Sequence, residues 1–322
     1  MSDVRAAERW TRADLHVHTS FSGWRSLRVL DAQDCYVSPD AAFTAARARR
    51  MDFVCFTDHD TIAGALDFLS RRPEEESRVI VGEEVEARFP GSPDWIHVNV
   101  LDVDEELHAD IVRLRGDGMA LLAELRRRGC FFVLNHPFQS FRSIGAARRR
   151  LSQVLPLCPA VEVCNGTSPR SHVGVLEALL GHAGGERVVR VGGSDAHTLQ
   201  GIASVHTAAP GATKREYLAS LRSGTCAILG RPRGVAALIG DVYAIVGEYY
   251  ARLYGEPAPR SSRWRRSFTV ASALLPAVAL GVPAAITACQ ALRQEYIARF
   301  GPWARGLRTP EALGVLSFED TR

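Results

Sequence analysis

Hydrophobic and polar positions along the first two thirds of the chain follow an alternating plan. Between residues 13 and 230, short apolar runs of β-forming residues are separated by longer stretches in which apolar positions recur at helical spacing. That order is typical of parallel strands joined by crossover helices. The pattern predicts strands at Ala13–Val17, Asp52–Thr57, Val79–Val85, Trp95–Leu101, Cys130–Asn135, Ala160–Cys164 and Arg187–Gly192.

Two of the intervening helices carry clear sequence signals. Ser38 is a good N-cap and Pro39 suits the first helical position, so a helix is expected from there to Arg50. A second helix is expected to fill much of Glu105–Arg128. Seven strand–helix units favour a closed α/β barrel, although a doubly wound open sheet has the same periodicity.

After Gly234 the pattern changes to a helical, alanine-rich tail. We therefore predict one large domain at residues 1–232 and a helical C-terminal extension at 233–322. Within the extension, Phe268–Cys289 has no charged residue over 22 positions and follows Trp264 and three arginines. This length could cross a bilayer, so membrane contact is one reading. Its alanines and two prolines suit a buried helical hairpin equally well.

Composition limits the class of protein. The 322 residues are 46% hydrophobic and 23% charged, which is typical of a folded globular chain. The net charge is +3, and the basic residues form no block, so a nucleic-acid platform is not expected. Seven cysteines without a CxxC pair and a polar N-terminus favour a reduced, cytoplasmic protein. Nothing in the sequence indicates an oligomeric state.

Histidines and carboxylates recur at the ends of the predicted strands. His16 and His18 are two residues apart on a strand, so both imidazoles face the same side and could form half of a transition-metal site. Alone, such a pair is weak evidence and is more often just two polar residues at a strand end. The carboxyl ends of barrel strands converge on one mouth, however, so the other polar strand-end residues would meet this pair. They are Asp58, His59, Glu84, His97, His136, Asp195 and His197.

The motifs DLHVHT, FTDHDT, GEEV, NHP and GSDAH occur in this order. Together they resemble the PHP family, named for polymerase and histidinol phosphatase domains, over about residues 13 to 230. The resemblance implies a distorted seven-stranded TIM-like (β/α) barrel holding two or three divalent ions of Zn, Mn or Fe. It also implies a metal-dependent phosphoesterase that hydrolyses a small phosphorylated metabolite, a nucleotide or a short oligonucleotide by a metal-activated hydroxide.

The resemblance further implies which residues hold the metals. Glu84 matches the carboxylate that bridges two of them, and we expect His59, His197 and Asp58 to take part in catalysis. Asp58 could instead cap the following helix. The implied ligands are His16, His18 and Asp195 for one metal, His97 and His136 for the second, and His59 and His197 for the third.

One departure from the family pattern concerns the third metal. Family members often carry an Asp shortly after the second His of the first motif, and this chain has Ser22-Gly23 there. Either Asp31, Asp34 or Cys35 replaces that Asp, or the third site is weak or empty. Two metals are therefore better supported than three.

Substrate contacts are harder to read. Arg25, Arg142 and Arg170 fall in predicted mouth loops and could bind phosphate through their forked donors, or be solvated. Asn165, like Glu162, ends a strand at the same mouth and could contact the substrate or support the metal ligands.

Two alternative functions stay open. Amidohydrolase-like C–N hydrolases also begin with HxH, but many need a mid-barrel lysine, and the only lysine here is Lys214, after the last motif. The second alternative is a non-catalytic, metal-binding PHP scaffold or regulator.

Overall fold

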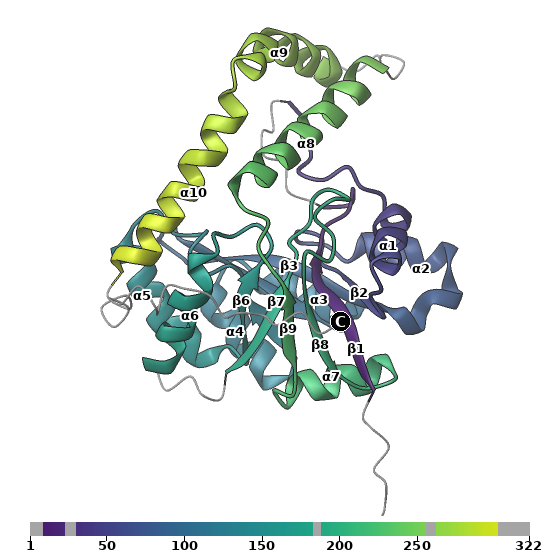
Figure 1. Ribbon diagram of the computed structural model, residues 1–322, viewed down its shortest axis with the longest axis vertical. Helices are drawn as coiled ribbons and strands as arrows, with labels where there is room; N and C mark the ends of the chain where they lie inside the picture. Colours follow the sequence, from purple (N-terminus) through teal and green to yellow (C-terminus); the bar gives the residue numbers. More distant parts are fainter. Residues whose placement is uncertain (1–8, 23–29, 183–187, 256–261, 302–322) are drawn as a thin grey trace, which may run out of the picture.

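The computed structural model describes residues 9–22, 30–182, 188–255 and 262–301. Its centre is a nearly closed, barrel-shaped sheet of nine strands with helices around it (Figure 1). All seven predicted strands are present, with two more after them. The strands are β1 Trp10–Val17, β2 Phe53–Phe56, β3 Val79–Arg88, β4 Trp95–Leu101, β5 Phe132–Leu134, β6 Ala160–Asn165, β7 Val189–Gly193, β8 Val205–Pro210 and β9 Ala227–Gly230.

The sheet differs from the expected seven parallel strands. Its order is β7-β6-β5-β4-β3-β2-β1-β8-β9, and β4 runs antiparallel to both β3 and β5. Only residues 89–94 connect β3 to β4, which is too short for a crossover helix and therefore makes a hairpin. β8 lies antiparallel to β1, and β9 antiparallel to β8.

The first and last strands of the series β1 to β7 approach each other and nearly close the barrel. Val17 of β1 forms a bridge with Ala196, which follows β7, and the His18 amide donates to the Ala196 carbonyl at 3.0 Å. Nearby, the Thr207 hydroxyl of β8 contacts both the amide and the carbonyl of Gly192 at 2.9 and 2.8 Å. The residues just after β1 and β7 are therefore neighbours in space.

Helices cover the outside of the barrel. The predicted cap at Ser38 is present, and its hydroxyl accepts from the Ala41 amide. The helix expected over Glu105–Arg128 is two helices, because Asp117 caps a second one through the amides of Met119 and Ala120. The helices around the barrel are α1 Pro39–Ala48, α2 Ala63–Arg71, α3 Glu105–Leu114, α4 Gly118–Arg127, α5 Ile144–Val154, α6 Ser171–His182 and α7 Lys214–Arg222, with 3-10 turns at Pro73–Arg78 and Leu155–Leu157.

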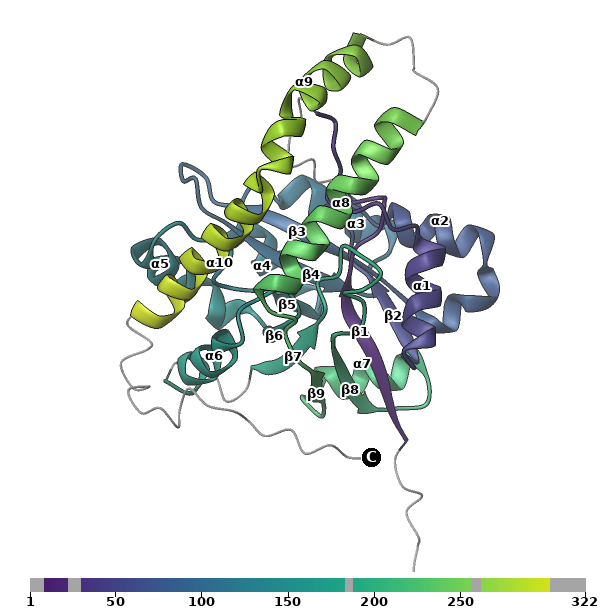
Figure 2. The same cartoon turned by 45° about the horizontal axis from the view of Figure 1, so that its top comes forward.

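The described part of the C-terminal extension contains three helices: α8 Val235–Gly255, α9 Ser262–Ala279 and α10 Val282–Phe300. In both views α9 lies farthest from the barrel and joins the other two (Figures 1 and 2). The segment 268–289 is therefore divided between α9 and α10, which meet at an angle of 71°. Within the described ranges, no single helix has the length and apolar character to cross a membrane, and α9 and α10 meet that test only as a bent pair. Membrane contact and a cytoplasmic location stay predictions, as does the domain boundary after residue 232.

The far end of α10 is fixed to α6. Glu295 accepts hydrogen bonds from the Ser171 hydroxyl and from Arg299 of its own helix. The Nε2 atom of His172 lies 4.0 Å from the Glu295 carboxylate. His172 is buried, with its ring edge-on to Phe138 at 5.1 Å. Arg293 also donates to the Gln139 carbonyl at 3.3 Å.

Acid is expected to weaken this attachment. Burial lowers the pKa of His172 to about 4, below the value of about 6.5 in an unfolded chain. Between these pH values the unfolded chain binds the extra proton, so stability is complete above pH 6.5 and falls as the pH falls. The free energy of unfolding should lose about 2 kcal/mol through His172 between pH 7 and pH 5. Urea unfolding of wild type and His172→Gln at both pH values measures it, and equal losses in the two proteins would contradict it.

Candidate metal centre

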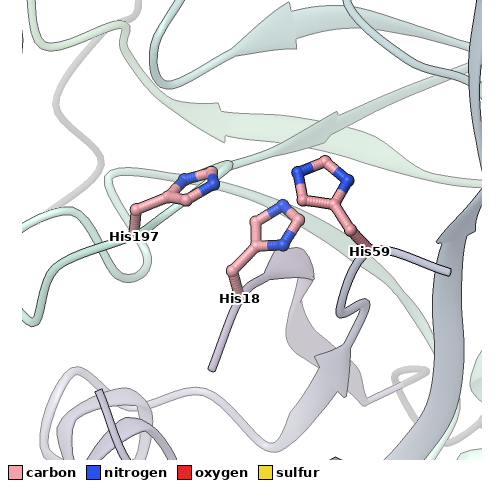
Figure 3. A group of neighbouring side chains, drawn as sticks. All are labelled: His18, His59 and His197. Carbon is pink, nitrogen blue, oxygen red and sulfur yellow. The ribbon is translucent and has the colours of Figure 1, made fainter. Parts of the chain in front are cut away.

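The predicted ligands come together at one rim of the barrel. Three groups have ligand atoms within 4.8 Å of one another: His18, His59 and His197; His16, Glu84, His136 and Asp195; and His59, Glu84 and His97. Figure 3 shows the first group, in which three rings from separate connections gather at one place. The ring of His18 lies 4.5 Å from that of His59 and 4.1 Å from that of His197, between centroids.

Strand direction explains why residues so far apart in sequence meet. His18, His59, His136 and Asp195 follow the carboxyl ends of the parallel strands β1, β2, β5 and β7. β4 contributes from its beginning instead of its end. Because β4 is antiparallel to β3, His97 pairs with Glu86 and therefore lies at the same rim.

The backbone at this rim is unusual. His136 and Asp195 have positive φ angles of 24° and 53°, a region of backbone conformation that residues other than glycine rarely adopt. Gly193 is required by close packing, because a Cβ there would lie 2.5 Å from the His16 Cβ. Strain of this kind persists only where the surroundings fix it, and it is concentrated at functional sites.

Glu84 is the centre of the cluster. Its Oε1 lies 2.9 Å from His136 Nε2, and its Oε2 lies 3.1 Å from His59 Nδ1. Burial would raise the pKa of Glu84, but His97, His16 and His59 hold it well below the ordinary value, so the carboxylate is ionised. One carboxylate thus faces five imidazoles, with the other three nitrogens at 3.1 Å (His97), 3.3 Å (His18) and 3.4 Å (His16).

Of the three candidates for the missing acidic ligand, Asp34 is the residue at the site. Its Oδ2 lies 3.3 Å from His59 Nε2 and 3.6 Å from His197 Nε2. Burial would raise the pKa of Asp34, but His197 and His59 outweigh it, so the pKa is below the ordinary value. Asp31 is exposed and pairs with Arg263. The Cys35 thiol donates to the His18 carbonyl, and burial raises its pKa, which keeps it protonated.

The arrangement fits divalent cations. Glu84 Oε2 is buried without a well-aligned hydrogen bond among the described residues, although two ring nitrogens lie within 3.3 Å of it. The Nε2 atoms of His16 and His18 face each other at 3.1 Å, where at most one proton fits between them. Nitrogen and oxygen lone pairs directed at common points are what a metal site needs.

Comparison with known proteins agrees with the motifs. Residues 14–115 match the family model described as PHP domain. Residues 14–115 are therefore similar to a PHP domain. The matched segment includes His16, His18, His59, Glu84 and His97, and the fold adds the ligand candidates that lie beyond it.

The proteins that this chain is similar to are distant in sequence. The chain is 31% identical over 74 residues to "Uncharacterized protein MJ1587" of Methanocaldococcus jannaschii, covering 23% of this chain and 43%, less than half, of that protein. The fold is similar to that of PsfC from Pseudomonas syringae, with a TM-score of 0.50, 19% identity and coverage of 74% of this chain and 99% of that one. A Bacteroides vulgatus two-domain protein "containing predicted PHP-like metal-dependent phosphoesterase" matches with a TM-score of 0.48, 17% identity and coverage of 70% and 66%.

A second layer of side chains orients the candidate ligands. Glu162 Oε1 accepts from His16 Nδ1 at 3.0 Å, and its Oε2 accepts from the His136 amide at 3.1 Å. The Asn135 side chain, next to His136 in sequence, donates to Glu84 Oε1 at 2.8 Å. Asn165, a substrate candidate in the sequence, has its amide group directed at Glu162 and Asp195 at 2.9 and 3.3 Å.

Glu162→Gln is expected to weaken metal binding about 10- to 100-fold, because a ligand-orienting carboxylate fixes both the tautomer and the direction of its imidazole. Titration of the chelated protein with Zn²⁺ or Mn²⁺ against a competing indicator measures the change. Glu177→Gln is the matched control. Glu177 lies on α6 and pairs with Arg190 of β7, away from the ligands. Equal affinities for wild type and Glu162→Gln would contradict this role.

The remaining sequence candidates lie outside the three ligand groups. Asp58 is buried and accepts hydrogen bonds from the amide and hydroxyl of Thr19 at 2.5 and 2.7 Å, so it fixes the loop after β1. Arg142 and Arg170 are exposed, and neither is among the residues that line the cavity above the cluster. Arg25 lies outside the described residues.

That cavity has a volume of about 270 Å³ and reaches down to Asp195 and His197. His197 is the most exposed of the clustered histidines, with 21% of its side chain accessible against 5% for His59. Its Nδ1 faces the Asp195 carbonyl at 3.0 Å, which leaves Nε2 directed toward the cluster. The cavity therefore opens onto the centre beside His197.

Proposed function

We propose that this chain is a metal-dependent phosphoesterase, a hydrolase of phosphate ester bonds that holds two or three divalent ions of Zn, Mn or Fe. One observation carries the proposal: an ionised carboxylate, Glu84, faces five imidazoles at the mouth of a PHP-like domain. Residue types and spacing are those of a multinuclear centre, because a carboxylate with ligand groups on both of its oxygens can bridge two cations.

The chain's own residues divide the work of holding the metals. His16, His136 and Asp195 would hold one cation together with Glu84, and His97 and His59 would hold the next, again with Glu84. His18 and His197, with Asp34, complete the third group. Divalent ions bound there would activate water and neutralise charge on the phosphoryl oxygens.

When only two cations are bound and the third group is empty, proton transfer to the leaving group is assigned to His197. It borders the cavity, whereas His59 lies beneath it with 5% of its side chain exposed. With Nδ1 donating to the Asp195 carbonyl at 3.0 Å, the ring orientation is fixed and Nε2 can hold or release a proton. Asp58 is placed to support the loop instead, through its two bonds from Thr19.

The test is hydrolysis of p-nitrophenyl phosphate and bis(p-nitrophenyl) phosphate by chelated protein to which Zn²⁺, Mn²⁺ or Fe²⁺ is returned. We expect hydrolysis only with metal, and more of one ester than of the other. Elemental analysis of the same samples gives the number of bound ions. Bound metal without hydrolysis of any ester would favour the non-catalytic scaffold.

The position of Lys214, the only lysine in the sequence, does not support the C–N hydrolase alternative. Lys214 Nζ donates to the carbonyls of Glu76 and Val79, both at 3.0 Å, at the start of β3. The cluster forms at the opposite rim, beyond the ends of the parallel strands. A lysine-bridged centre is thus not available to the described residues, and an amide substrate added to the ester panel tests the lysine-free version.

A further inference from the structure

The helical extension forms much of the cavity above the ligand cluster. α8 and α10 lie over the same end of the barrel (Figure 2), and both contribute side chains to its lining. The barrel supplies the base, with Asp195 and His197 at the bottom and Gln139 and Thr167 beside them. A group attached to a phosphate held at the cluster must therefore extend between the two helices.

The two helices present chemically different walls. From α8 come Leu238, Val242 and Ile245, spaced four and three residues apart and so on one helical face. From α10 come Gln290 and Gln294, one turn apart, with Thr287 before them. Neither glutamine side chain has a hydrogen-bond partner within the described part of the chain. One wall is apolar, and the facing wall offers free amide donors and acceptors.

Charge in this upper part of the cavity is balanced. Apart from the cluster itself, Arg233 and Asp241 are the charged residues among those that line it. Their side chains form an ion pair, and the Thr198 hydroxyl donates to the other Asp241 oxygen at 2.7 Å. Asp241 thus neutralises the guanidinium, and among the described residues no second cation lines the cavity to bind a further phosphate.

We infer that this cavity binds the leaving alcohol of a small phosphate monoester, and that this alcohol is uncharged, with one apolar side against α8 and hydrogen-bonding groups toward Gln290 and Gln294. The inference rests on the proposed function. In the reaction, a water oxygen bonds to phosphorus, the phosphorus–oxygen bond to the alcohol breaks, and the alcohol oxygen takes a proton. The products are inorganic phosphate and the free alcohol.

Size and charge both exclude a polymer from this cavity. A volume of about 270 Å³ is at the lower end of small-molecule pockets, which run from about 300 to 1,000 Å³. An oligonucleotide would bring further phosphates, which need cations that are not already neutralised. A sugar phosphate and a nucleoside monophosphate share the required chemistry, an uncharged alcohol rich in hydrogen-bonding groups.

The first experiment removes the polar wall. In Gln290→Leu/Gln294→Leu, KM for a hexose 6-phosphate or a nucleoside 5′-monophosphate should rise about tenfold, since two hydrogen bonds to the substrate are lost. The kcat should stay within about twofold, because these residues do not touch the reacting atoms. Phenyl phosphate, which has no such groups, should keep its KM. The ester with the larger change identifies the kind of alcohol.

Gln153→Leu is the matched control, since Gln153 is exposed on α5 and pairs with Arg150. It should leave every KM unchanged, and melting curves check that each variant is folded. If the double variant hydrolyses phenyl phosphate and its KM values for all esters are unaltered, the inference is overturned. The proposed phosphoesterase function would not be affected by that result. No hydrolysis of any ester by metal-loaded wild type would instead remove the proposed function itself.

The second experiment removes the counter-charge of Arg233. Asp241→Asn keeps an oxygen for the Thr198 hydroxyl but leaves Arg233 without its counter-charge. KM for a nucleoside 3′,5′-bisphosphate should fall about tenfold, because the guanidinium can then pair with the added phosphate. KM for the monophosphate should not change. A wild type that already prefers the bisphosphate would overturn the inference.

Discussion

Glu84→Gln is expected to lower kcat about a thousandfold or more and to abolish binding of at least one metal ion. The amide keeps the size of the side chain but loses the charge that five imidazoles surround. A glutamine also offers only one oxygen, so it cannot bridge two cations. Metal activation is worth several kcal/mol, and each 1.4 kcal/mol is about tenfold in rate.

The preceding residue is a matched control for this prediction. Glu83 is buried on the same strand but faces away from the cluster, where its carboxylate contacts His108 Nδ1 at 3.0 Å. Glu83→Gln should therefore keep both the metal content and kcat within a few fold, even if it melts earlier. Steady-state rates and elemental analysis compare the two variants. A Glu84→Gln protein with a full metal complement and normal kcat would exclude the bridging role.

The strand pattern and the candidate ligands could be predicted from the sequence for one physical reason. Strands such as Trp95–Leu101 are buried and apolar, so a histidine within or just after one is conspicuous. Convergence at one rim follows from the parallel order of the strands. The direction of β4 was not predicted, because an apolar strand has the same pattern in either direction, and only the short 89–94 connection reveals it.

Other features have no local signal in the sequence. β8 (VHTAAP) is alanine-rich and ends in Pro210, and β9 (AILG) has only four residues, so neither gave a clear strand pattern. Asp34 could not be chosen over Asp31 and Cys35, because only the folded loop shows which side chain reaches His59 and His197. The cavity walls were missed as well, since glutamines on an alanine-rich helix look like ordinary surface positions until α10 is seen beside the barrel.

Metal removal is expected to lower the melting temperature by about 10 °C. A ligand present at about a thousand times its dissociation constant stabilises the folded chain by about 4 kcal/mol, and each kcal/mol shifts the melting temperature of a domain this large by about 2–4 °C. Here the ligands come from β1, β3, β4 and the connections after β2, β5 and β7, so a bound ion would join most of the barrel. Unfolding would have to release it.

Melting curves followed by circular dichroism, before and after chelation, measure this shift. Return of Zn²⁺ or Mn²⁺ should restore the higher temperature, whereas Mg²⁺ should not, because Mg²⁺ prefers oxygen ligands and this cluster is dominated by imidazoles. The Glu84→Gln variant should show a smaller shift, since it has lost the carboxylate between the ligand groups. Identical melting with and without bound metal would mean that these side chains do not join the strands through a shared cation, and the proposed chemistry would lose its basis.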